Sequence, residues 1–190
     1  MKQPKSLETW KGFHWCFFIN IQGLIICLKR FEKYVIVEDI TKAKIELETA
    51  TELILASGAA MELAGTFNRQ EYEDNVRQTM KPPNVESQNF SGLMSWEHGA
   101  LIQLWKKLRP IFNNVPSSLK PEYENFINAY WGLVNAHKQI CKKFGGEESG
   151  SLRFGNTKAV DTLEKFAHAR GKLIGSTVAE DMEPKAKSRV

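Results

Sequence analysis

The stretch SSLKPEYENFINAYWGLVNAHKQICKKFGG, residues 117–146, decides the fold class of this chain. Its apolar residues recur at alternating steps of four and three, which is the spacing of one face of a bundle helix. Ser117 or Ser118 can cap the helix, Pro121 suits its first turn, and the glycine pair from Gly145 stops it. The apolar face consists of Phe126, Tyr130, Leu133, His137, Ile140 and Phe144. This stretch therefore predicts a long amphipathic helix.

Helical patterns recur along the chain, whereas alternating strand patterns are almost absent. The first of the other predicted helices is capped by Ser6 and reaches about Tyr34, and the second is capped by Asp39, covers 40–64 and is stopped by Gly65. A short helix over 69–80 follows, and then a helix from Gly92 or Leu93 to Arg109, which Pro110 ends or kinks. The last predicted helix covers 157–174. The run 34–37 alone resembles a strand and is expected to link two helices. We therefore predict an all-α, single-domain helical bundle of about six helices over 1–175, with a polar, flexible tail over 176–190.

The composition is that of a soluble globular domain. The chain has 190 residues, of which 42% are hydrophobic and 25% charged, enough for one sizeable core. Its net charge of +4 is spread over short clusters near predicted helix ends, which does not favour nucleic-acid binding. Three cysteines without a paired framework indicate a reducing compartment, and we expect a cytoplasmic protein.

The segment 12–28 is apolar nearly all round and follows several lysines, as a signal peptide or membrane span would. It is interrupted by His14, Asn20 and Gln22, no small-residue cleavage site follows, and it is at the short limit for crossing a bilayer. A helix in the centre of a bundle has the same composition. We expect this helix to be buried in the protein and not to enter a membrane.

Three of the four histidines fall on apolar faces of three different predicted helices. The two faces besides that of residues 117–146 are Trp10, His14, Phe17, Ile21, Leu24 and Leu28 in the first helix, and Met94, His98, Leu101, Trp105, Leu108 and Phe112 in the fourth. We therefore predict that His14, His98 and His137 are buried. His168 lies four residues after Glu164 and is expected to form a solvated ion pair.

Histidines on facing bundle helices are typical of a metal or haem site, because imidazole is a common ligand of iron, zinc and copper. Glu97 or Glu62 could complete a set of ligands with His14, His98 and His137. No ExxH or HExxH motif fixes the metal, so iron, haem and another metal all stay open. For haem, Trp96, Trp105 and Trp131 could supply an aromatic pocket. The alternative is that each histidine is a core residue hydrogen-bonded to a neighbour.

The residues around His137 carry a family resemblance. His137 is followed by Cys141 at the fourth position, by a Gly/Ser-rich run from Gly145, and by the pair Leu152-Arg153. This order resembles the tryptophan 2,3-dioxygenase superfamily, in which the haem-ligating histidine of a helix precedes a Gly/Ser-rich loop and a Leu-Arg pair, and some members carry a cysteine four residues after a histidine. The resemblance implies that His137 is the iron ligand and that the reaction is oxygen chemistry on an aromatic substrate.

Other kinds of catalytic site find no support in the sequence. It contains no nucleophile elbow, P-loop or dinucleotide fingerprint, and Cys141 on an apolar face is expected to remain a protonated, unreactive thiol. We therefore favour a haem- or metal-dependent, oxygenase-like enzyme with an internal histidine-containing pocket for a small aromatic molecule. The alternative is a non-enzymatic interaction protein that forms a homodimer through its apolar first helix.

Overall fold

The computed structural model describes residues 3–86, 95–145 and 158–175. Its long helices are α1 (Lys5–Ile36), α2 (Ile40–Ala64), α4 (Trp96–Asn113), α5 (Lys120–Gly145) and α6 (Ala159–Gly171), and a short α3 (Arg69–Glu71) follows α2. All regular elements of these described ranges are helical. Over these ranges the protein is therefore an all-α bundle with six α-helices, as the apolar periodicity predicts.

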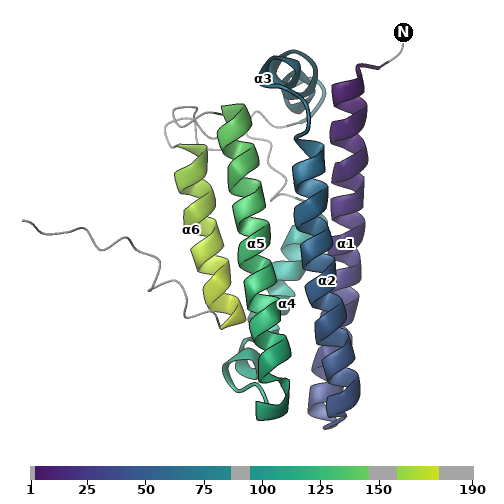
Figure 1. Ribbon diagram of the computed structural model, residues 1–190, viewed down its shortest axis with the longest axis vertical. Helices are drawn as coiled ribbons and strands as arrows, with labels where there is room; N and C mark the ends of the chain where they lie inside the picture. Colours follow the sequence, from purple (N-terminus) through teal and green to yellow (C-terminus); the bar gives the residue numbers. More distant parts are fainter. Residues whose placement is uncertain (1–2, 87–94, 146–157, 176–190) are drawn as a thin grey trace, which may run out of the picture.

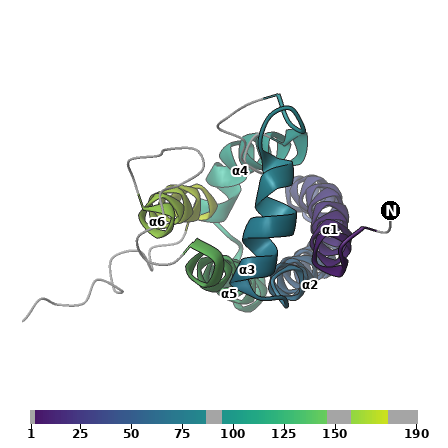
Figure 2. The ribbon, with the colours of Figure 1, turned by 90° about the horizontal axis from the view of Figure 1, so that it is seen from above.

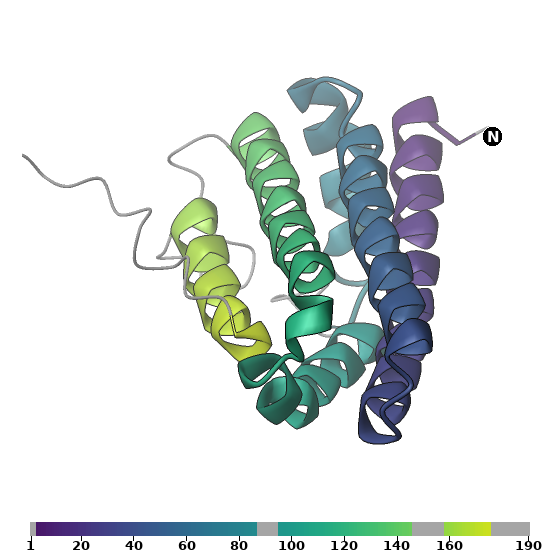
Figure 3. The same cartoon turned by 60° about the horizontal axis from the view of Figure 1, so that its bottom comes forward.

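The helices form a bundle that packs both chain neighbours and helices distant in the sequence side by side. α1 and α2 run antiparallel along most of their length, α5 packs on the other side of α2, and α6 lies outermost beside α5 (Figures 1 and 3). α4 lies behind this row and contacts α1, while the segment that includes α3 crosses one end of the bundle (Figure 2). Consequently α1, α4 and α5, which carry the three histidines of interest, all face the interior of one bundle.

The bounds of α2 follow from its end signals. The Asp39 side chain accepts a hydrogen bond from the backbone N–H of Lys42 at 3.2 Å, and the N–H of Gly65 bonds to the Glu62 carbonyl at 3.0 Å. The predicted helix over 40–64 is confirmed at both ends.

The ends of α1 differ from the prediction. The helix begins at Lys5 after Pro4, and Ser6 is buried inside its first turn, where its hydroxyl accepts a hydrogen bond from Asn75 at 3.1 Å. Ser6 is therefore a packing contact and not a cap. The strand-like run 34–37 is helical up to Ile36, because a helix paired so closely with α2 continues until the turn into that helix.

The predicted helix over 69–80 is helical throughout but changes its pitch. Asn68 and Glu71 form a reciprocal capping box, and α3 then passes into a π-helix over Tyr72–Val76 and a 3₁₀ helix over Arg77–Met80. The wider turn brings Tyr72 and Val76 into the core. Sequence periodicity could not reveal this change, because each segment is only three to five residues long and too short to show its own spacing of buried residues.

The proline in α4 does not end the helix. Pro110 lies in its last turn and the helix continues to Asn113, so that Phe112 reaches the core and is almost fully buried. The side-chain amide of Asn114 donates a hydrogen bond to the Pro110 carbonyl at 3.1 Å. Packing of Phe112 therefore outweighs the helix-breaking tendency of proline near a helix end.

The start and end of the remaining helices are close to those predicted. A 3₁₀ turn over Ser117–Leu119 leads into α5, which ends at Gly145. α6 begins at Ala159, two residues later than predicted, and continues as a 3₁₀ turn over Lys172–Ile174. The predicted loop residues 87–92 and 146–156, the helix start at Gly92 or Leu93, and the tail over 176–190 lie outside the described residues.

The core has a main part and a smaller part at one end. The main part joins α1, α2, α4 and α5 around the fully buried Phe31, Leu47, Leu108 and Phe126. The smaller part joins Leu7, Tyr72, Val76 and Phe144, with Trp10 packed against them. Small residues let α2 approach α5 closely: a Cβ on Gly58 would lie 3.7 Å from the Leu133 Cα.

Helix α1 is long and apolar enough to cross a membrane by length and composition, and 33% of its most apolar window is buried inside the protein. The buried part is one face, which includes Phe17, Leu24 and Phe31. The opposite face is exposed and carries Trp15 and Ile19. The prediction of a buried first helix is therefore confirmed for its inner face and wrong for its outer face.

Candidate functional site

His98 is fixed at the start of α4 by the residue that caps the helix. The Ser95 hydroxyl accepts a hydrogen bond from the His98 backbone N–H at 3.3 Å and lies 3.0 Å from the ring nitrogen Nδ1. The ring also stacks on Phe17 of α1, with 5.8 Å between ring centroids. In the tautomer in which the Nδ1–H donates to the Ser95 hydroxyl, the other ring nitrogen, Nε2, has a free electron pair for a ligand.

His14, on α1, is also fixed through its ring nitrogen Nδ1. Its Nδ1 lies 2.8 Å from the Trp10 carbonyl oxygen, to which the ring N–H donates, and its ring packs on Trp10 with 4.1 Å between centroids. A hydrogen bond from one ring nitrogen fixes the tautomer and leaves Nε2 as the electron-pair donor, which is how ligating histidines are held in metalloproteins.

His137 lies on α5 and is half-buried, as His14 and His98 are, so the prediction that the three are buried is met only in part. No hydrogen bond to His137 is found within the described part of the chain. Burial lowers the pKa of His137 to about 4, and the nearby His98, Arg170 and His14 lower it further in that order. An electrostatic effect of His98 and His14 on His137 requires that both imidazoles lie near that of His137. The structure thus brings His14, His98 and His137 to one region of the bundle.

The three histidines are neutral near pH 7. Burial, followed by the Arg170 charge, lowers the pKa of His98 to about 4, with Glu97 opposing the shift. Burial also lowers the pKa of His14, and its bond to the Trp10 carbonyl opposes this. Only the neutral imidazole has a free electron pair for a metal, so the three histidines are in the protonation state that metal binding would need.

A pH dependence of stability follows from these values. The pKa values of His98 and His137 are about 4 in the folded protein, against about 6.5 in the unfolded chain. The unfolded chain therefore binds more protons between these values, and stability falls as the pH drops from 6.5 to 4 but is unaffected above 6.5. Since both rings are half-buried and partly screened, we expect a loss of about 2 kcal/mol between pH 7 and 4.5.

Urea unfolding at pH 7, 5.5 and 4.5 measures this loss. The His98→Gln/His137→Gln double variant is the comparison, because it removes both titrating rings and should show a smaller decrease over the same interval. An equal decrease in the variant and the original protein would assign the acid sensitivity to other groups.

Two further residues belong to this region, and the sequence analysis missed both. Arg170 of α6 lies close enough to lower the pKa of both His98 and His137. Tyr130, on the same face of α5, is buried and donates a hydrogen bond to the Ala167 carbonyl at 2.7 Å, which ties α6 to α5. No pattern in the sequence singles out Arg170, since it lies on a helix rich in charge. Only the packing of α6 reveals it.

The carboxylates proposed as ligands lie elsewhere. Glu62 is exposed on α2, and Glu97 accepts a hydrogen bond from the Gln22 side chain at 3.2 Å near the surface. Among the described residues, no three His, Cys, Asp or Glu side chains are close enough to hold one metal ion. Glu62 therefore does not complete a set of ligands with the histidines, because the helix turns that side of α2 to solvent.

His168 and Cys141 were also considered in the sequence. His168 is half-buried against Trp131, with 5.4 Å between ring centroids, and Glu164 pairs with Lys138. The predicted solvated pair of His168 with Glu164 is therefore wrong. Cys141 lies one helical turn after His137, and burial raises its pKa to about 11, which agrees with an unreactive, protonated thiol.

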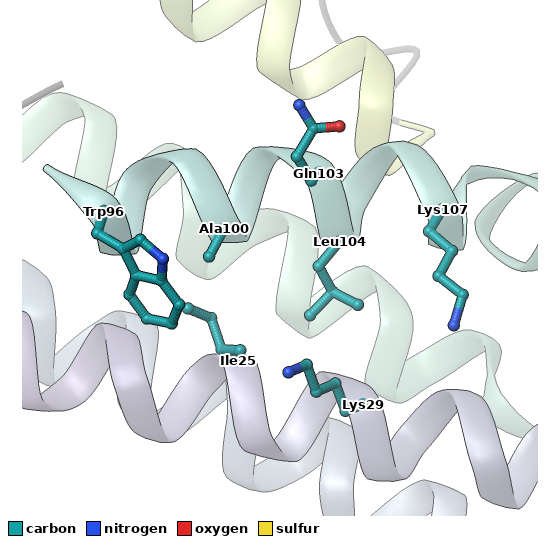
Figure 4. Close-up of a pocket in the computed structure, with 7 residues that line it drawn as sticks. All are labelled: Ile25, Lys29, Trp96, Ala100, Gln103, Leu104 and Lys107. Atoms are coloured by element: carbon teal, nitrogen blue, oxygen red, sulfur yellow. The ribbon is translucent and has the colours of Figure 1, made fainter. Parts of the chain in front are cut away.

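The three tryptophans proposed as pocket walls have different surroundings. Trp105 is buried in the main core, and its ring nitrogen has no hydrogen-bond partner among the described residues. Trp131 packs on Tyr130 and His168. Trp96 is 74% exposed and lines a groove of about 330 Å³ between α1 and α4, together with Ile25, Ala100 and Leu104 (Figure 4). The groove is lined by none of the three histidines.

Comparison with known proteins assigns the chain to a family. The chain belongs to the SfmD 3-methyl-L-tyrosine peroxygenase family, whose model matches residues 1–124. The match includes His14 and His98 and ends before His137. The relationship is thus to an oxygenase-like family, as expected, but not specifically to the tryptophan 2,3-dioxygenase superfamily.

One relative is the 3-methyl-L-tyrosine peroxygenase of Streptomyces lavendulae. It is 26% identical to this chain over 168 residues, which make up 87% of this chain and 46% of that protein. The chain therefore spans about half the length of this relative. No solved structure matches the chain.

Proposed function

We propose that this protein is a haem-dependent peroxygenase-type enzyme that transfers an oxygen atom to the ring of a tyrosine-like amino acid. The observation that carries the proposal is the convergence of His14, His98 and His137, each held neutral, from three helices of one bundle. The substrate class comes from the family and from its Streptomyces relative, which is named for 3-methyl-L-tyrosine.

The donor set fits haem better than a bare metal ion. A bare ion needs three or four donors within about 2 Å of one point, and the described residues contain no such group. A porphyrin supplies four of the donors itself, so one or two imidazoles are enough. His137, with no competing hydrogen bond in the described residues, is the residue proposed to hold the iron, and His98 is the second candidate ligand. Bound haem would supply the activation of peroxide and the transfer of its oxygen.

The surrounding residues fit a planar aromatic group and a polar substrate. Phe17 stacks on His98 and Trp10 on His14, so that aromatic rings adjoin two of the three imidazoles. The buried N–H of Trp105 lies on the same face of α4 as His98 and has no partner in the described chain, which suits it to donate a hydrogen bond to a bound molecule.

Arg170 is the candidate anchor for a carboxylate. Its positive charge is felt by both His98 and His137, so it lies beside the proposed site. A guanidinium binds the planar carboxylate of an amino acid in two-pronged fashion, and the same chemistry suits a haem propionate. Through its charge, Arg170 also helps to keep the two imidazoles neutral.

Turnover of the loaded protein tests the proposed reaction. The full chain is loaded with hemin, then supplied with hydrogen peroxide and either 3-methyl-L-tyrosine or L-tyrosine, and the products are analysed by mass spectrometry. We expect a product heavier than the substrate by one oxygen atom, formed only when both hemin and peroxide are present. Loaded protein that gives no such product with either amino acid would contradict the proposed reaction.

Removal of the Arg170 charge is expected to weaken substrate binding. A charge-assisted hydrogen bond contributes about 1.5–3 kcal/mol, so Arg170→Ala should raise KM for the amino acid by about 10-fold or more while kcat changes less. Steady-state kinetics measure both values. Lys165→Ala is the control, since Lys165 is an exposed cation of the same helix. Equal KM values for the Arg170→Ala variant and the original protein would remove Arg170 from substrate binding.

A further inference from the structure

Helix α1 carries a second regular seam on its outer side, which we call the outer seam. It runs at alternating steps of three and four, as does the buried face with Phe17, Ile21 and Leu24, which we call the inner seam. The residues of the outer seam are all exposed: Lys5, Glu8, Gly12, Trp15, Ile19, Gln22, Ile26, Lys29, Lys33 and Ile36. Steps of three and four keep residues in line along one side of a helix that supercoils around a partner. The outer seam therefore has the pattern of a helix-packing face, but α2 and α4 pack on the other side of α1.

The middle of the outer seam is strongly apolar. Trp15 is 69% exposed, Ile19 63% and Ile26 51%. The exposed Trp96 and the groove beside Ile25 extend this apolar surface onto α4 (Figure 4). A continuous exposed patch of large apolar side chains usually marks an interaction surface.

We propose that the outer seam binds the outer seam of a second copy of this chain, with the two α1 helices antiparallel and the twofold axis between Asn20 and Ile21. This register places Trp15 opposite Ile26 of the partner subunit and Ile19 opposite Gln22 of the partner subunit. A twofold axis repeats each contact, so the large apolar residues all become covered.

Charge along the seam selects the antiparallel register. In this register Glu8 lies opposite Lys33 of the partner subunit, and Lys29 lies opposite Gly12 of the partner subunit, which leaves room for the long side chain. A parallel pair would place Lys29 and Lys33 against their own copies and Glu8 against Glu8. Like charges directly opposed destabilise a helix pair, whereas opposite charges at its ends set the orientation. Neither Glu8 nor Lys33 is engaged in an ion pair within the described residues.

A lipid surface is a poorer occupant than a second copy. The apolar part from Trp15 to Ile26 is about 16 Å long at a rise of about 1.5 Å per residue, about half of the hydrocarbon thickness of a bilayer. Charged residues bound it on both sides, and the inner face of α1 is committed to the core of the bundle. Insertion would therefore require unpacking α1 from α2, whereas a helix-to-helix contact does not.

The first test is the association constant measured by analytical ultracentrifugation of the full chain. We expect a dimer at micromolar concentration, and the Trp15→Ala/Ile26→Ala double variant should dissociate at least about 100-fold more readily, because the twofold axis repeats the Trp15–Ile26 contact and four large side chains are lost from the interface. Ile45→Ala/Leu55→Ala is the matched control, since both residues are exposed apolar residues of α2 outside the outer seam. Circular dichroism and thermal unfolding establish that each variant is folded.

The second test is a charge exchange that depends on the register. Glu8→Lys and Lys33→Glu should each weaken the dimer about 5- to 10-fold, and the double variant that combines them should recover the original affinity, because the pair is restored in the opposite sense. A parallel dimer would not recover, and that result would overturn the register. A monomer at 100 µM would overturn the proposal, and so would binding of the chain to phosphatidylcholine–phosphatidylglycerol vesicles that depends on Trp15 without any dimer.

Discussion

Replacement of His137 by Gln is expected to weaken hemin binding by about 100-fold or more. Loss of an axial ligand removes a coordinate bond outright, and even changes around a ligand reduce affinity 10- to 100-fold. Gln is close to His in size and polarity, so the bundle should tolerate it at this half-buried position. Titration with hemin, followed by its absorption spectrum, measures the affinity.

The matched control for this variant is His168→Gln. His168 is also half-buried and also lies on a helix of the bundle, but it packs on Trp131. We expect it to bind hemin as the original protein does. If the His137 and His168 variants bind hemin equally well, His137 is not the ligand. His98→Gln, measured alongside, separates a second ligand from a neighbouring residue.

Replacement of Phe31 by Ala is expected to lower the free energy of unfolding by about 3–5 kcal/mol. Phe31 is fully buried in the main core and stacks on Phe112, with 6.2 Å between ring centroids. Its removal leaves a cavity between α1 and α4, which the rigid helices cannot fill. Urea unfolding measured at pH 7 gives the free energy.

Ile45→Ala on α2 is the control for the Phe31 variant. Ile45 is more than half exposed, so the same kind of truncation should change stability by less than about 0.5 kcal/mol. A Phe31→Ala variant within 1 kcal/mol of the original protein would contradict the position of α1 against α4. That position matters for function because it holds Phe17 against His98.

The fold class could be read from the sequence because its helices have strong periodicity and clear end signals. The Asp39 cap and Gly65 fix α2, and the apolar face of α5 is found as predicted, with Phe126 and Tyr130 buried. Where end signals were ambiguous, packing decided. Ser6 became a buried contact of Asn75 and not a cap, and Pro110 was accommodated because Phe112 reaches the core.

The candidate site could be predicted only in part. The position of a histidine in a periodic pattern gives the side of a helix on which it lies but not its height along the bundle. The packing of α1, α4 and α5 in one bundle sets that height, and it places His98 and His14 near His137. Arg170 was missed because it is one of several charged residues on α6, and Glu62 was included because a carboxylate among apolar neighbours resembles a buried one, although it is exposed.

The first helix shows that composition alone does not predict which side of a helix is buried. A helix that is apolar on nearly every side indicates a buried element, but α1 has two apolar seams with different surroundings. The inner seam, with Phe17 and Leu24, packs against the bundle, and the outer seam, with Trp15 and Ile19, is exposed. Only the arrangement of α2 and α4 around α1 distinguishes them.

The central claim is that the convergent histidines bind haem, and one measurement tests it most directly. Increasing amounts of hemin are added to the full chain at pH 7. The visible absorption spectrum is recorded after each addition. We predict saturation at one hemin per chain with a spectrum typical of histidine-ligated iron. A spectrum that remains that of free hemin at every ratio would contradict the account.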